Sequence, residues 1–133
     1  QPLVRGYAWC MLGNGNPDEL RAVLTEAGFA EEADAEMGVT YYTSPDMPFG
    51  ITTYMNGEIC DVTSETVGTT EALGALVVIA GTVGFGTLNA DCETMLLAGS
   101  VRTELTSSGN DPVCTSETSS NVRFTFGASA LDQ

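Results

Sequence analysis

The sequence predicts an α+β fold, in which an antiparallel sheet carries two helices on one face. Two segments, one after Asn16-Pro17 and one after Thr69, have apolar residues at helical spacing. Asn56-Gly57 and Gly99-Ser100 each separate two strand-like segments and are typical of two-residue hairpin turns. Strands joined by hairpins form antiparallel sheets, and helices then cover one face of such a sheet.

The first predicted helix has the clearest start in the chain. Asn16 suits the N-cap, Pro17 the first helical position, and Glu19 the third position of a capping box. Gly28 is placed to end the helix with a left-handed residue. The apolar stripe of this helix, from which Arg21 is excluded, consists of Leu20, Val23, Leu24 and Ala27.

The second predicted helix begins at Thr69 or Thr70, and it is apolar over much of its circumference. Its stripe consists of Leu73, Leu76, Val77 and Ala80. Val78 and Ile79 are apolar as well, so the last turns present few polar side chains. A helix of this kind is usually buried on more than one side.

Seven further segments have the alternation or β-branched and aromatic content of strands. They are residues 4–12, 37–44, 49–55, 58–63, 92–98, 101–106 and 122–126. The acidic, alanine-rich segment 30–36 is interpreted as a connector. The predicted order is therefore β-α-β-β-β-α-β-β-β.

An internal similarity divides the single predicted domain of 133 residues into units 4–63 and 64–127. In both units a Gly-Phe pair precedes a cysteine, and the sequence Thr-Ser-Glu-Thr then follows, at residues 63–66 and 115–118. A duplication of one β-α-β-β unit explains this order. Two α+β segments of convergent composition explain it equally well.

The chain has four widely spaced cysteines and no histidine, which favours two disulfides over a metal site. From their order we favour the pairs Cys10–Cys60 and Cys92–Cys114. Disulfides form in oxidising compartments. A chain that begins at Gln1 also fits a mature form after signal-peptide removal, so we expect a secreted or periplasmic protein.

Charge and missing residue types exclude several classes of function. The 18 acidic residues and four arginines give a net charge of −14, which disfavours nucleic acid and anionic membranes as partners. No apolar segment reaches the roughly 20 residues of a membrane span. Without histidine or lysine, serine or cysteine triads and Schiff-base chemistry are ruled out. The glycine-rich segments 13–16 and 81–86 lack the context of phosphate loops, and we expect no cofactor.

These exclusions lead to a non-enzymatic binding or assembly protein, whose partner is another protein or a second copy. Its candidate interface combines the apolar second helix with two strand tyrosines. The candidate residues are Leu76, Val78, Ile79, Tyr42 and Tyr54.

Three alternatives stay open. The first is an acidic inhibitor or immunity-type protein that blocks a basic enzyme, for which the acidic run 31–36 is one candidate surface. The second is a hydrolase that uses a pair of carboxylates, although no two acids stand out. The third is a calcium-dependent module around residues 14–19, where helix capping explains the same residues without a metal.

Overall fold

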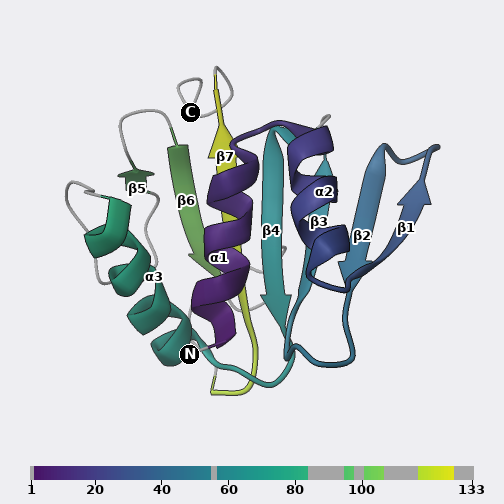
Figure 1. The fold of residues 1–133 in the computed structure, drawn as a ribbon. Coiled ribbons are helices and arrows are strands. Elements are labelled where there is room, and N and C mark those ends of the chain that lie inside the picture. Colours follow the sequence, from purple (N-terminus) through teal and green to yellow (C-terminus); the bar gives the residue numbers. More distant parts are fainter. Residues whose placement is uncertain (1, 55–56, 84–94, 98–100, 107–116, 128–133) are drawn as a thin grey trace.

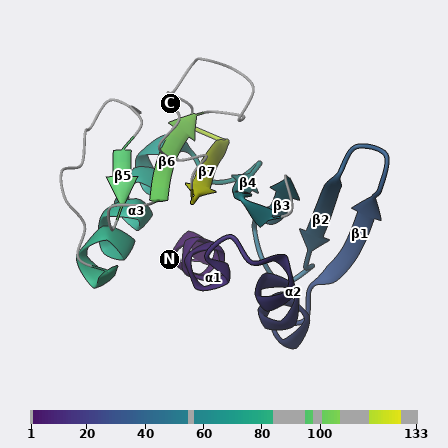
Figure 2. The same ribbon diagram turned by 90° about the horizontal axis from the view of Figure 1, so that it is seen from above.

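The computed structural model describes residues 2–54, 57–83, 95–97, 101–106 and 117–127. Three helices cover one face of a seven-stranded antiparallel sheet (Figures 1 and 2). The helices are α1 (Pro2–Gly13), α2 (Pro17–Glu26) and α3 (Thr69–Val83). The α+β class is therefore confirmed, with three helices among the described residues instead of the two expected.

The sheet has the strand order β1-β2-β3-β4-β7-β6-β5. Its two halves join where β4 pairs with β7, with Cys60 opposite Phe124 and Val62 opposite Val122. The strands are β1 (Ala30–Asp34), β2 (Val39–Thr43), β3 (Gly50–Tyr54), β4 (Ile59–Ser64), β5 (Met95–Leu97), β6 (Val101–Thr106) and β7 (Ser120–Phe126).

The strand expected over residues 4–12 is wrong, because this segment belongs to helix α1. Leu3, Tyr7 and Cys10 are spaced by one helical turn and are fully or almost fully buried against the sheet. Gly6 allows this close approach, since a Cβ atom there would lie 2.8 Å from Cε1 of Phe49. The segment carries a single charged residue, Arg5, so its helical periodicity is weak in the sequence.

The connector expected over residues 30–36 is also wrong, because Ala30–Asp34 forms the edge strand β1. All five residues are exposed, so the strand has no buried face and no alternation of apolar residues. Backbone pairing with β2, from Ala30–Thr43 to Asp34–Val39, holds it in the sheet. Charged side chains at such an edge discourage pairing with other chains.

Helix α2 has the predicted boundaries. The Asn16 side chain accepts hydrogen bonds from the backbone N–H groups of Asp18 at 3.0 Å and Glu19 at 3.2 Å. Gly28 follows the helix with a φ of +91°, the left-handed conformation that glycine adopts most readily. Arg21 lies on the outer side and pairs with Glu31 of β1 at 2.6 Å, which ties α2 to the sheet edge.

The other strand predictions are confirmed within one or two residues for β2, β3, β4 and β6. Strand β7 is buried on its helix-free face as well, because Asn121 and Thr125 on that face are only 3% exposed. The turn residue Asn56, the Gly99-Ser100 turn, and Cys92 and Cys114 lie outside the described residues.

The internal duplication is not confirmed. Unit 4–63 contains α1, α2 and the first four strands, whereas the described part of unit 64–127 contains α3 and three strands. A repeat would require the same element order in both units.

Candidate functional site

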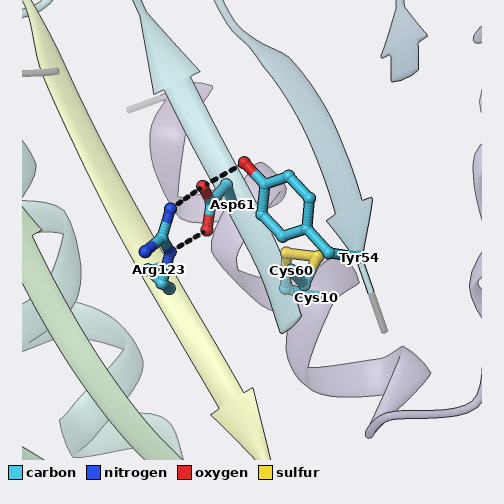
Figure 3. The surroundings of a disulfide bond; sticks show 5 residues. All are labelled: Cys10, Tyr54, Cys60, Asp61 and Arg123. Carbon is cyan, nitrogen blue, oxygen red and sulfur yellow. Dashed lines mark hydrogen bonds and ion pairs between the residues drawn. A yellow bond between two sulfur atoms is a disulfide. The ribbon is translucent and has the colours of Figure 1, made fainter. Parts of the chain in front are cut away.

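The disulfide Cys10–Cys60 joins helix α1 to the central strand β4, as the order of the cysteines favoured (Figure 3). The two Cα atoms are 5.8 Å apart, and both cysteines are only 1% exposed. A bond so well shielded from solvent serves as a structural crosslink, because redox-active cysteines need access to their partners.

Three of the five predicted interface residues belong to the core. Leu76 is 2% exposed, Ile79 4% and Tyr42 3%. On α3 the buried positions Ala72, Ala75, Leu76 and Ile79 follow helical spacing and face the sheet. Tyr42 faces the helices from β2, and its hydroxyl donates a hydrogen bond to Glu31 at 3.0 Å. These three side chains are therefore not available to a partner.

Val78 is the predicted interface residue that is exposed, at 52%, and its neighbour Val77 is 50% exposed. Both lie on the side of α3 that faces away from the sheet. Val77 was expected on the buried stripe of this helix. In the structure Ile79 is buried in place of Val77, because a helix can bury only one face against a flat sheet.

Helix α1 continues this exposed apolar surface. Its outer side consists of partly buried Val4 and Ala8, exposed Arg5, and Leu12, which is 62% exposed. We define the α1–α3 surface by these side chains together with those of the adjoining β2–β3 loop and of α3. Its residues are Pro2, Val4, Arg5, Ala8, Leu12, Asp46, Met47, Val77 and Val78.

Two hollows shape the α1–α3 surface. One, of about 630 Å³, is lined by Pro2, Val4, Arg5, Asp46, Met47 and Val78. The other, of about 430 Å³, is lined by Arg5, Ala8, Trp9, Leu12, Ala27 and Met47. Arg5 and Met47 line both, so the two hollows adjoin at these side chains. Among the described residues that line the hollows, Arg5 and Asp46 are the charged ones.

The face of the sheet opposite the helices carries a polar cluster of Asp61, Arg123 and Tyr54 (Figure 3). Asp61 follows Cys60 on β4 and therefore points to the other side of the sheet. It accepts hydrogen bonds from Nε of Arg123 at 2.9 Å, from Nη2 at 3.0 Å and from the Tyr54 hydroxyl at 2.8 Å. These bonds compensate a carboxylate that is only 2% exposed.

The electrostatics of this cluster favour a structural role. Burial, together with the charge of Asp61, raises the pKa of Tyr54 to about 12. The hydrogen bonds that Arg123 donates to Asp61 raise the pKa of its guanidinium. At neutral pH the cluster thus holds a neutral phenol and a closed ion pair, and neither group is poised to exchange a proton. The hydroxyl of Tyr54, the fifth predicted interface residue, is therefore already hydrogen-bonded within this cluster.

The described residues offer little to the other predicted site chemistries. Asp61 is the one buried acid among them, and its partner is an arginine rather than the second carboxylate of a hydrolase. Within the same residues, no group of three or more acidic or cysteine side chains could hold a metal ion. None of the described helices is long and apolar enough to cross a membrane.

Comparisons with known protein families, with curated proteins and with solved structures give no match for this chain. Sequence reasoning identified Val78 but missed the α1 half, because residues 4–12 were assigned to a strand. The available signal was the helical spacing of Leu3, Tyr7 and Cys10.

Proposed function

We propose that this chain is a non-enzymatic protein-binding module of an oxidising compartment, secreted or periplasmic, and that it binds its partner on the α1–α3 surface. The observation that carries this proposal is the apolar outer side of α1 and α3. In a sandwich of helices on a sheet, this side faces water and is normally polar.

Helix α2 shows the normal case in the same molecule. Its outward residues include Asp18, Arg21 and Glu26, all exposed. By contrast, α1 exposes Leu12, and α3 exposes Val77 and Val78. Contiguous exposed apolar surface of this kind marks interaction sites in soluble proteins. Covering it contributes roughly 25 cal/mol for each Å² of apolar area removed from water.

The compartment is proposed from the Cys10–Cys60 disulfide. It closes a loop with a sequence separation of 50 residues and links the helix layer to the sheet. Cytosolic proteins rarely retain such bonds, because thiol reductants keep cysteines reduced there.

A second candidate function, an acidic inhibitor of a basic enzyme, is favoured by the β1–β2 hairpin. This hairpin lies at the edge of the sheet (Figure 2), and Glu32 and Asp34 are exposed on β1. In that case the partner would contact the hairpin, and binding would weaken steeply with salt.

Site-specific photo-crosslinking in the native host separates the two candidates. A photoreactive residue is placed at Val78 on the α1–α3 surface, at Glu32 on the hairpin, or at Ala22, an exposed control on α2. The proposal expects a discrete crosslinked protein at Val78 and none at Ala22. A product at Glu32 alone would favour the inhibitor, and the absence of any product at Val78 would refute the α1–α3 proposal.

A further inference from the structure

We infer that the α1–α3 surface binds a second copy of this chain across a two-fold axis, with Arg5 of each copy paired to Asp46 of the other. This inference rests on the proposed function, since it names the partner of the same surface.

Arg5 differs from the other three arginines. Arg21 pairs with Glu31, Arg102 with Glu104, and Arg123 with Asp61. Among the described residues, Arg5 forms no ion pair, although the chain has 18 acids for four basic residues.

Asp46 lines the same hollow as Arg5 and likewise forms no ion pair with a described residue. The described lining of this apolar hollow thus carries one positive and one negative charge, and the two side chains form no ion pair with each other.

The presence of one positive and one negative charge favours a second copy of the chain over a basic protein as the partner. Two copies, each with a net charge of −14, repel one another over most of their surfaces. The lining of the two hollows is an exception, because its charges sum to zero. A basic partner would instead be drawn to the acidic surfaces of the chain and would meet Arg5 here.

Two-fold symmetry uses both charges at once. In a two-fold interface, residue i of one copy contacts residue j of the other, and j contacts i in return. One contact of this kind forms two Arg5–Asp46 pairs. Val78 and Met47 line the hollow beside them and supply the apolar contact that excludes water. Charged pairs gain strength when neighbouring contacts remove solvent.

The test is light scattering on the purified chain at about 0.15 M salt, where the Debye length is about 8 Å and long-range repulsion is screened. The wild-type chain is expected at twice its 13.9 kDa mass. Arg5→Asp and Asp46→Arg each create two like-charge contacts and should weaken the dimer at least about tenfold. The double variant reverses both pairs, keeps the net charge of −14, and should restore the dimer.

Glu36→Arg is the matched control for Asp46→Arg. Both exchange an acid for arginine at a turn, but Glu36 lies in the β1–β2 turn, away from the α1–α3 surface. It should leave the dimer unchanged. Circular dichroism of every variant checks that the fold is retained.

Two results would overturn the inference. One is a wild-type chain that stays monomeric at every concentration tested, and the other is a dimer that survives both single charge reversals. Either result is compatible with a photo-crosslink from Val78 to a different protein. In that case the proposed function stands and only the identity of the partner is wrong. Without a Val78 crosslink, the proposed function fails as well.

Discussion

Removal of the Cys10–Cys60 disulfide should strongly destabilise this fold. The change is Cys10→Ala together with Cys60→Ala. The bond joins residues separated by 50 positions, and the loop that it closes contains α2 and the strands β1, β2 and β3. Without it, the unfolded chain regains the entropy that this large loop had lost.

The magnitude follows from the loop length. For a closed loop of this size the chain-entropy relation predicts a loss of about 4 kcal/mol in the free energy of unfolding. Domains are typically stable by only about 5 to 15 kcal/mol. Both sulfur atoms are buried, so the lost packing adds to the cost.

Equilibrium unfolding in guanidinium, followed by the fluorescence of the single tryptophan, measures the effect. Trp9 lies on α1 with its ring centroid 5.3 Å from that of Phe29, so its emission reports on the helix layer. The single variants Cys10→Ala and Cys60→Ala are the controls. Each already breaks the crosslink, so the double variant should cost far less than the sum of the two. A loss below about 1 kcal/mol, or costs that simply add, would refute the reasoning.

Three further predictions concern the polar contacts. Asp61→Ala should lower the free energy of unfolding by about 3 kcal/mol, because Arg123 is left without its partner; urea unfolding should show that Asp61→Leu combined with Arg123→Met is the milder change, and the reverse order would contradict this. Asn16→Ala should cost about 1 kcal/mol through loss of the α2 cap, measured as a lower unfolding midpoint, and an unchanged midpoint would exclude a role for the cap. Burial raises the pKa of Tyr54 from 10.0 to about 12, so the contribution of its neutral phenol to the free energy of unfolding should be fully present below pH 10 and be lost as the pH rises from 10 through 12. Ultraviolet titration of tyrosinate in the wild type and in Tyr54→Phe tests this, and an identical titration of both chains would count against it.

The sequence was most informative where one local interaction dominates. Asn16, Pro17 and Gly28 bound α2 as predicted, because capping and left-handed glycine depend on a few adjacent residues. The hairpin strands β2, β3 and β4 followed from alternation and turn residues in the same way. The cysteine order indicated the Cys10–Cys60 bond, although spacing alone left other pairings open.

Prediction failed where long-range contacts override local pattern. An apolar run such as residues 4–12 fits either a strand or a helix by itself. It forms a helix here because it packs on the apolar face of the sheet, and Gly6 allows the close approach. Residues 30–34 form a strand because β2 offers a free edge, although the segment has no apolar alternation. The candidate interface was divided in the same way, with Leu76, Ile79 and Tyr42 buried and Val78 exposed.

The sequence by itself determined the α+β class, the position of α2, the excess of acids and the lack of histidine and lysine. These are properties of composition and of neighbouring residues, which a linear pattern records. Only the tertiary structure decided which apolar side chains the sheet covers. Burial depends on which element a helix packs against, and β7 enters the sheet from the far end of the chain. The pairing of β4 with β7, the Asp61–Arg123 contact and the α1–α3 surface arise from that arrangement.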